Sequence, residues 1–566
     1  MGKHRLLASL LSVSVLGCSL AACASTERPA PEDTAGMLAD GLSRLDVSGG
    51  LFASSTVDAV NGMLAHLVGG MAPLKPTVTV AGVEEISGNE AEATLDWVWD
   101  VNASDTDYTY STNVTLQLGA QNKWETRFRS TTVHADLKPG ERLVRQTTTA
   151  PRADILGARN AVLVRDTPVW HVGIDKAVLT EREYATWADY LARYLELDPG
   201  AYSAKVLAAG PRDFVEANTL RKDRVAASFE ADIATIPGAA THSGRQSLAS
   251  YPSFAQPLLG AVGTAPEELI AATNGELAPG DEAGLSGLQL EYDAQLRGAA
   301  AVTVRIANAE QDLSKPLFEL PAEPGEPLQT TLDPGLQSLA ESALANESSA
   351  AALVAVRPST GGILAAANGP GSKGAQTALL GEYPPGSMFE LVTGLAEQRG
   401  GEDSPDSVAD AARALGIGTE WRLGTAAAAG SVPEAGAQAE QAAVLAGQGD
   451  VRLSPLAVAV AGASMARGER VAPLLITPGT EPAESPDTDS VTSGEAAKLR
   501  RALLSPGGGA QMMAGTSGSE SGKGTHSWAL AVDDDLAVAV FIDNGGADPD
   551  SAAALLLEIF LAAVAG

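Results

Sequence analysis

The sequence predicts an α+β protein built from several domains. With 566 residues, the chain is long enough for two to four domains. Residues 32–145 begin with two amphipathic helical segments and continue with long segments in which apolar and polar residues alternate. Residues 328–566 combine apolar helical segments with two apolar hairpins. Both patterns indicate helices packed on antiparallel sheets.

The composition is that of a globular protein with a strongly acidic balance. Hydrophobic residues make up 45% of the chain and charged residues 19%, so disorder is not expected. Its 70 Asp and Glu residues against 38 Lys and Arg residues give a net charge of −32. Because nucleic acids and anionic lipids attract basic surfaces, this charge argues against a nucleic-acid partner. It suits a secreted protein that must stay soluble.

Residues 1–23 have the pattern of a bacterial lipoprotein signal peptide. A basic start, "MGKHR", precedes an apolar stretch, Leu6–Leu16, that is too short to span a bilayer comfortably. "LAAC", ending at Cys23, resembles a lipobox, whose cysteine becomes the lipidated first residue. "VLGC", ending at Cys18, is the alternative, and an ordinary cleaved signal peptide is a third interpretation. We therefore expect a lipid-anchored protein on the extracytoplasmic face of the bacterial cell membrane.

The first domain, residues 32–145, is expected to be a small α+β unit. Apolar residues at helical spacing predict two helices, over residues 38–45 and 57–67. The period then changes to two in "AEATLDWVWDV" and "YTYSTNVTLQL", which predicts a curved antiparallel sheet wrapped on the helices. The aromatic residues on these strands are interpreted as core rather than as a ligand site.

The middle region, residues 146–320, has a less regular pattern. "AVLVRDTPVWHVGI" is strand-like and "EREYATWADYLARYLEL" is an amphipathic helix pattern. The region alone indicates no function. The Pro-rich segment "LPAEPGEP", Leu320 to Pro327, marks its boundary with the third region.

The third region, residues 328–566, is expected to place helices around an antiparallel sheet. "AALVAVRPSTGGILAAAN", from Ala351 to Asn368, predicts a hairpin, and a second hairpin is expected around Asp533–Asp535. The apolar segment Ala552–Ala565 is too short for a membrane span and predicts a helix packed on the sheet.

A serine stands at the start of an apolar helix pattern in "EYPPGSMFELVTGLA". A rigid Pro-Pro-Gly turn delivers Ser387, and Glu390 follows one helical turn later. A serine at a helix N-terminus is a common nucleophile, but a serine with a glutamate three residues on is also a capping box, which stabilises a helix start by ~1 kcal/mol. The capping box is our preferred interpretation of this pair.

Seven segments together resemble the class B penicillin-binding proteins, the D,D-transpeptidases that cross-link peptidoglycan. They are "APRADILGARNAVLV", "GLSGLQLEYDAQLRG", "TTLDPGLQSLAESAL", "ALVAVRPSTGGILAAAN", "YPPGSMFELVTGLA", "AGQGDVRLSPLAVAVAGASMARGERVAPLL" and "MAGTSGSESGKGTHSW". The resemblance implies a nuclear-transport-factor-like MecA-type domain over residues 32–145, a pedestal or dimerisation domain over 146–320 and a transpeptidase-like domain over 328–566.

The resemblance also implies where the catalytic residues belong, and there this sequence departs from the family. The family uses Ser-x-x-Lys, Ser-x-Asn and Lys-Thr-Gly. The corresponding positions here hold Ser387 with Glu390 at the lysine position, Ser404-Pro405-Asp406, and Gly515, Thr516 and Ser517. A carboxylate is a much weaker base than a neutral amine. Lys523 is a possible substitute cation, and Ser404–Asp406 is interpreted as an exposed acidic loop.

The expected function is therefore a penicillin-binding-protein-like lipoprotein of cell-wall assembly that is catalytically degenerate and acts by binding or scaffolding. Its expected partners are peptidoglycan stem peptides or other cell-wall synthesis proteins. The alternatives are an active D,D-transpeptidase acylated at Ser387 that binds penicillin, and a β-lactam sensor. No metal or cofactor is expected, because the six histidines are scattered and no phosphate-loop, dinucleotide or calcium motif is present.

Overall fold

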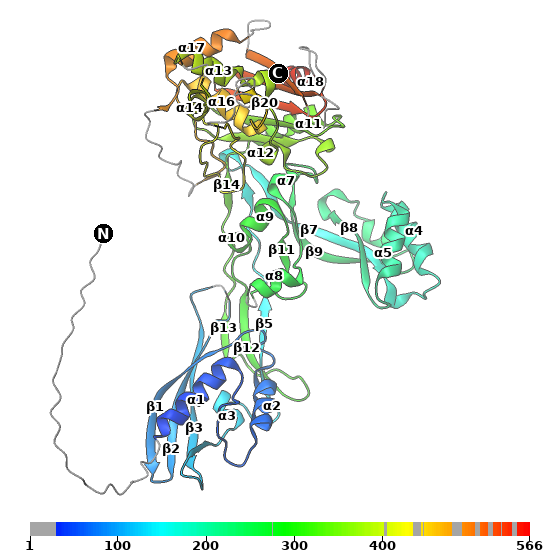
Figure 1. The fold of residues 1–566 in the computed structure, drawn as a ribbon. Coiled ribbons are helices and arrows are strands. Elements are labelled where there is room, and N and C mark those ends of the chain that lie inside the picture. Colours follow the sequence, from blue (N-terminus) through cyan, green and yellow to red (C-terminus); the bar gives the residue numbers. More distant parts are fainter. Residues whose placement is uncertain are drawn as a thin grey trace, which may run out of the picture. The chain divides into compact units, whose positions relative to one another are not determined.

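The computed structural model describes residues 30–102, 104–273, 276–400, 404–433, 443–444, 447–477, 489–503, 510–518, 525–533, 535–545 and 552–565. The chain divides into two compact units. The first comprises residues 1–101, 105–146 and 302–320, and the second the remainder. Each unit is described by itself below (Figure 1).

The first unit packs three helices on a four-stranded antiparallel sheet of order β1-β2-β3-β4. A second sheet of order β13-β12-β5 completes the unit. Its elements are α1 (Pro31–Arg44), α2 (Val57–Val68), β1 (Thr77–Ser87), β2 (Glu90–Trp99), β3 (Tyr108–Leu118), β4 (Trp124–Thr126), α3 (Ser130–Val133), β5 (Arg142–Thr148), β12 (Ala301–Ala307) and β13 (Phe318–Leu320).

The alternation predicted for the first domain is confirmed in strand β2. Every second side chain of β2 is buried against the helices, because successive residues of a strand point to opposite faces. Trp97 and Trp99 are fully buried in this core, as the interpretation of the aromatics predicted. Their rings stack with centroids 6.4 Å apart.

Within the middle region, residues 302–320 pack apart from residues 147–301. Residues 302–320 return to the first unit, where β12 pairs with β5 and β13. The physical reason is that Val302, Val304 and Ile306, at every second position of β12, point to the same face of the strand. Their side chains are buried in the core of the first unit. The residues between β5 and β12 belong to the second unit.

The second unit begins with a six-stranded sheet of order β17-β14-β6-β7-β8, in which β9 also pairs with β7. Short helices and a two-stranded sheet, β10-β11, accompany it. The elements of this part are β6 (Ile155–Leu156), β7 (Val162–Asp175), α4 (Tyr184–Tyr194), α5 (Pro199–Ala208), β8 (Phe214–Arg221), α6 (Phe229–Ile233), β9 (Ala239–Ala249), α7 (Gln256–Leu259), β10 (Val262–Thr264), α8 (Glu267–Ala272), β11 (Glu282–Gly284), α9 (Gly287–Glu291) and α10 (Asp293–Arg297).

The remainder of the second unit is built around a five-stranded antiparallel sheet of order β16-β15-β20-β19-β18. Its elements are β14 (Leu328–Thr330), α11 (Pro334–Leu344), β15 (Ala351–Val356), β16 (Ile363–Asn368), α12 (Thr377–Leu380), α13 (Glu390–Gln398), α14 (Pro405–Ala414), α16 (Pro455–Arg467), β17 (Ile476–Thr477), α17 (Ser493–Ala502), β18 (Gln511–Gly518), β19 (Thr525–Asp533), β20 (Leu536–Ile542) and α18 (Ala552–Ala565). Two of these strands, β14 and β17, join the six-stranded sheet.

Both predicted hairpins and the terminal helix are confirmed. The strands β15 and β16 pair antiparallel, as do β19 and β20. Helix α18 covers Ala552–Ala565 and buries Ala553, Leu557 and Phe560 against one face of the sheet, together with α11. Helix α16 contacts β15, β19 and β20 and is buried along almost its whole length. The sheet is therefore covered by helices on both faces, with α16 in the cluster on one face and α11 and α18 in the cluster on the other.

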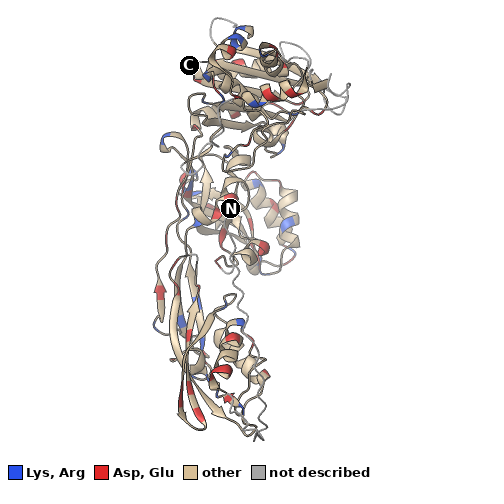
Figure 2. Ribbon diagram, turned by 60° about the vertical axis from the view of Figure 1, so that its left-hand side comes forward, with Lys and Arg blue, Asp and Glu red and all other residues tan. Residues whose placement is uncertain are grey.

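Among the described residues, no helix has both the length and the apolar character that crossing a membrane requires. Acidic residues are distributed over helices and strands of both units rather than gathered in one place (Figure 2).

Candidate active site

Ser387 lies on a tight turn that leads directly into a helix. Residues Gly386–Phe389 form a 3₁₀ turn, and α13 begins at Glu390. Met388 and Phe389 are buried in the core, whereas Ser387 is exposed. The apolar side chains that follow the serine thus fix the turn, and the serine hydroxyl is left at the surface.

The Pro-Pro-Gly turn before Ser387 is attached to strands β18 and β19. The carbonyl oxygen of Pro384 accepts hydrogen bonds from Ser517 Oγ at 2.6 Å and from Trp528 Nε1 at 3.2 Å. Gly386 has a φ of +54°, and a Cβ there would lie 2.2 Å from the carbonyl oxygen of Thr516. A glycine is therefore required at this position.

The other side of the turn is attached to residues 447–453. The backbone groups of Tyr383 and Leu453 exchange two hydrogen bonds, of 3.0 and 2.9 Å, and the N–H of Gly386 donates to Gly447 at 3.0 Å. The glycine of the "GQGD" segment is needed because a Cβ on Gly447 would lie 2.5 Å from Phe389 Cβ. The serine turn is thus held from two sides.

Ser387 itself contacts strand β18 at the residues aligned with Lys-Thr-Gly. Its Oγ accepts a hydrogen bond of 3.1 Å from the backbone N–H of Thr516. A Cβ added to Gly515 would lie 3.1 Å from Ser387 Oγ and 2.8 Å from the backbone nitrogen of Met388. The backbone of residue 515 therefore approaches the serine turn so closely that a glycine fits where the family carries a lysine.

The predicted capping box between Ser387 and Glu390 is wrong. Helix α13 has Phe389 at its N-cap and no side-chain capping bond. The reason is that Ser387 lies in the 3₁₀ turn before the helix, with its Oγ directed to Thr516. The local pattern does not distinguish a serine at the N-cap from one located a few residues earlier.

Glu390 is exposed and lines a groove between α13, α17 and β18. The groove has a volume of about 690 Å³ and an apolar floor that includes Leu391 and Leu499. Lys498, on α17, lines the same groove. Sequence reasoning missed Lys498, because no local pattern connects it to a serine more than a hundred residues earlier in the chain.

The interpretation of Ser404–Asp406 as an exposed acidic loop is wrong in one respect. Pro405 is buried and is the first residue of helix α14, and Ser404 is its N-cap without a side-chain capping bond. Proline is favoured at the first helical position, where its missing N–H has no partner to lose. Neither Ser404 nor Asp406 forms a hydrogen bond with the Ser387 side chain, whose only hydrogen-bond partner among the described residues is Thr516.

Three of the candidate residues, Cys18, Cys23 and Lys523, lie outside the described residues. Within the described ranges, no group of three or more His, Cys, Asp or Glu residues is arranged to hold a metal ion.

The described arrangement presents a serine without a base. A serine becomes a nucleophile when a neighbouring group takes its proton. In the part of the chain that the structure describes, no lysine or histidine is hydrogen-bonded to Ser387. The residue one helical turn later is a glutamate that faces a groove.

Comparisons with known proteins agree with this architecture. A family model, the penicillin-binding protein dimerisation domain, matches residues 147–330. No curated protein matches the chain significantly. One similar solved structure is the complex between penicillin-binding protein PBP2 and MreC from Helicobacter pylori, with 15% identity and a TM-score of 0.53, covering 75% of this chain and 99% of that chain. At this identity the match establishes the fold.

Proposed function

Because the chain has the architecture of a class B penicillin-binding protein, with the family's dimerisation domain at residues 147–330, we propose that it acts in peptidoglycan assembly by binding rather than by catalysis. The transpeptidase-like part serves as a scaffold for peptidoglycan stem peptides or for other cell-wall synthesis proteins. PBP2 of the similar structure is in complex with MreC, which supports a protein partner of this kind.

The observation that carries the proposal is the environment of Ser387. Its Oγ accepts a backbone hydrogen bond from Thr516, and the close approach of Gly515 leaves no room there for a cationic side chain. Acylation of a serine needs a base for the hydroxyl proton and stabilisation of the charge that develops in the transition state. In the family, the base at this position is a lysine, which becomes positively charged when it takes the serine proton. This chain has Glu390 there, whose carboxylate is negatively charged.

The proposal includes a location. Lipid attached at Cys23 anchors the protein on the extracytoplasmic face of the membrane, where peptidoglycan is assembled. The net charge of −32 is compatible with this location, because a lipid anchor does not require a basic surface.

The test is acylation by a fluorescent penicillin, read by intact-protein mass. We expect no adduct on the full chain after minutes at ordinary drug concentrations, and the same result for Ser387→Ala. A stoichiometric adduct on the wild type that is lost in Ser387→Ala would refute the scaffold and restore the transpeptidase.

Lys498 is the observation that favours the transpeptidase as a second candidate. It is a lysine of α17 that lines the same groove as Glu390, together with Met512, Met513 and Ala514 of β18. If an adduct forms, Lys498→Ala tests whether this lysine supports it, and Lys523→Ala tests the cation that the sequence indicates. Loss of the adduct in one variant and not in the other identifies the substitute group.

A further inference from the structure

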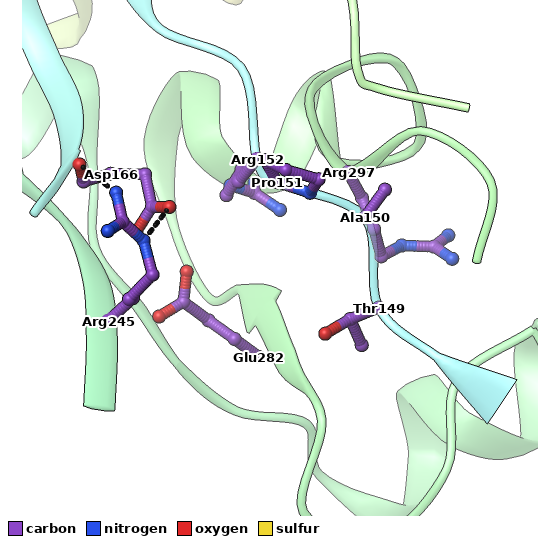
Figure 3. Close-up of a pocket in the computed structure, with 8 residues that line it drawn as sticks. All are labelled: Thr149, Ala150, Pro151, Arg152, Asp166, Arg245, Glu282 and Arg297. Atoms are coloured by element: carbon purple, nitrogen blue, oxygen red, sulfur yellow. Dashed lines mark hydrogen bonds and ion pairs between the residues drawn. The ribbon is translucent and has the colours of Figure 1, made fainter. Parts of the chain in front are cut away.

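A cavity lined by charged side chains lies in the second unit, away from the serine turn. Its volume is about 470 Å³, which is within the range of small-molecule sites. The residues that line it are Thr149, Ala150, Pro151, Arg152, Asp166, Arg245, Glu282 and Arg297 (Figure 3). They come from the segment before β6 and from β7, β9, β11 and α10.

Each arginine of the cavity has a carboxylate partner. Arg152 Nη1 is 2.8 Å from Asp293, and Arg245 Nε is 2.6 Å from Asp166. Arg297 contacts both Asp293 and Glu276, each at 3.1 Å. The three guanidinium groups are therefore neutralised by three carboxylates.

Glu282 is a fourth acidic side chain at the cavity, beyond the three carboxylates that pair with the arginines. Among the described residues, no arginine or lysine is within ion-pair distance of its carboxylate. The side chain projects into the cavity beside the Arg245–Asp166 pair (Figure 3). Burial raises the pKa of Glu282 to about 7, although Arg152 opposes the shift. A buried acid without a cation is costly to ionise, so a cation brought by a ligand would stabilise the ionised form of Glu282.

The residue paired with Asp166 across the sheet carries an unpartnered polar group. Ser247 is 6% exposed, and its Oγ has no hydrogen-bond partner within the described structure. Ser247 lies opposite Asp166 in the β7–β9 pair, so both side chains are on the same face of the sheet. Asp166 lines the cavity, and Ser247 is therefore directed to the same side.

Two of the guanidinium groups still have donors available. The bonds of Arg245 use its Nε and one terminal nitrogen, and those of Arg297 likewise, which leaves Nη1 of each without a partner within the described structure. A ligand that carries only a positive charge would be repelled by Arg245 and Arg297. A ligand that carries only a negative charge would be repelled by the carboxylates of Glu282 and Asp166.

We propose that this cavity binds a small zwitterion, an amino acid or a short peptide. Its ammonium group lies against the Glu282 carboxylate and its carboxylate against Nη1 of Arg297 or Arg245. The ammonium stabilises the ionised form of Glu282, and the carboxylate takes the unused guanidinium donors. The Ser247 hydroxyl is available as a further hydrogen-bonding group.

Binding is expected to depend on pH, because the ammonium prefers the ionised form of Glu282. The charged groups around Glu282 are Arg152, Asp166, Arg245, Asp293 and Arg297, all in ion pairs. An adjoining cavity shares Glu282 and Arg245 and is lined also by His171, His242 and Glu216. Lowering the pH from about 7.5 to about 6 protonates Glu282 and should weaken binding several-fold.

The experiment is calorimetric titration of the full chain with alanylalanine. Two matched probes are its N-acetyl derivative, which lacks the ammonium, and its amide, which lacks the carboxylate. We expect saturable binding of the dipeptide at pH 7.5, weaker binding of the amide and none of the N-acetyl derivative. Equal binding of the dipeptide and its N-acetyl derivative, or no saturable binding of the dipeptide, would overturn the proposal.

Glu282→Gln is the variant that tests the assigned residue. It should weaken dipeptide binding about tenfold or more, since the ammonium then donates to a neutral amide oxygen instead of a carboxylate. Glu268→Gln, which changes an exposed acid on α8 outside the cavity, is the matched control and should bind as the wild type does. Unchanged binding by Glu282→Gln contradicts the assignment. If that variant does not fold, the pH dependence of the wild type decides: affinity that does not fall between pH 7.5 and 6 refutes the role of Glu282.

Discussion

The backbone N–H of Thr516 donates a hydrogen bond of 3.1 Å to Ser387 Oγ. This bond joins the turn before α13 to the edge strand β18 and fixes the orientation of the hydroxyl. A hydroxyl that accepts from a backbone amide can still donate its own proton, and among the described residues no acceptor is hydrogen-bonded to that proton. The bond thus places the serine turn directly against the strand that carries Gly515, Thr516 and Ser517.

Restoring one catalytic position should not restore acylation. Glu390→Lys supplies a lysine one turn after Ser387, but members of a catalytic unit act together, so a single addition recovers little. We expect no stoichiometric penicillin adduct on Glu390→Lys by intact-protein mass. Gly515→Lys should fail for another reason, because its Cβ would lie 2.8 Å from the backbone nitrogen of Met388 and displace the serine turn.

The control for both variants is the wild-type chain treated in parallel, with Ser387→Ala as the blank. A stoichiometric adduct on Glu390→Lys alone would show that the site lacks only a base.

Gly386→Ala should destabilise the second unit strongly. The residue has a φ of +54°, and its Cβ would lie 2.2 Å from a backbone carbonyl oxygen of β18. We expect a loss of about 2 kcal/mol or more, from strain and from displaced backbone. The matched control is Gly374→Ala, with a φ of +82° and no atom within 4 Å of the new Cβ. This control should show the conformational cost alone, about 1 kcal/mol. Equal losses in denaturant unfolding would contradict the close approach.

Glu390→Ala should change the free energy of unfolding by less than about 0.5 kcal/mol, because Glu390 is exposed and caps nothing. Thr492→Ala provides the comparison. Thr492 and Glu495 form a reciprocal capping box at the start of α17. Its removal should cost about 1 kcal/mol. Chemical denaturation of the two variants side by side is the measurement, and a larger loss for Glu390→Ala than for Thr492→Ala would reverse our assignment.

Acid should weaken the contact between α13 and α17 through Glu495. Hydrogen bonding from Arg399, with further bonds from Thr492, lowers the pKa of Glu495 from 4.5 to about 2. A lowered pKa means that the stabilisation is present above pH 4.5 and is lost as the pH falls toward 2. The thermal midpoint of the wild type should therefore fall more steeply between pH 5 and pH 2 than that of Glu495→Gln. Parallel pH profiles would show that this ion pair contributes nothing.

The mature chain should begin at Cys23 and carry lipid. The basic start, the apolar stretch and "LAAC" motivate this prediction. Mass spectrometry of the mature N-terminus is the measurement, and Cys23→Ser should abolish the lipid mass while Cys18→Ser should not. A mature start after residue 23, or wild-type protein released freely into the medium, would contradict it.

The hairpins and the terminal helix were predictable because their signals are local. A Pro-Ser-Thr-Gly-Gly turn between two apolar runs predicts β15 and β16, and the apolar run Ala552–Ala565 is helix α18 over the same residues. Because both faces of these strands are buried, nearly every residue in them is apolar, and an uninterrupted apolar run is easy to recognise in the sequence.

Contacts between distant segments were not predictable in the same way. Val302, Val304 and Ile306 alternate as any half-buried strand does, and nothing local indicates that they return to the first unit. Likewise, the serine pattern at residue 387 matches a capping box, and only the approach of β18 shows that its Oγ has another partner. Lys498 and Glu282 could not be singled out from the sequence, because the residues that surround them come from other helices and strands.

The position of β15 in its sheet bears on how this chain is made. β15 pairs on one side with β16, its immediate successor, and on the other with β20, which follows far later in the chain. While the chain folds, the β15–β16 hairpin therefore leaves the pairing edge of β15 open until β20 arrives. Such long-range pairing is slow, and the open edge is prone to aggregation in the meantime. A chain interrupted before residue 536 would retain that unpaired edge permanently, so degradation or chaperone binding should be the fate of truncated translation products.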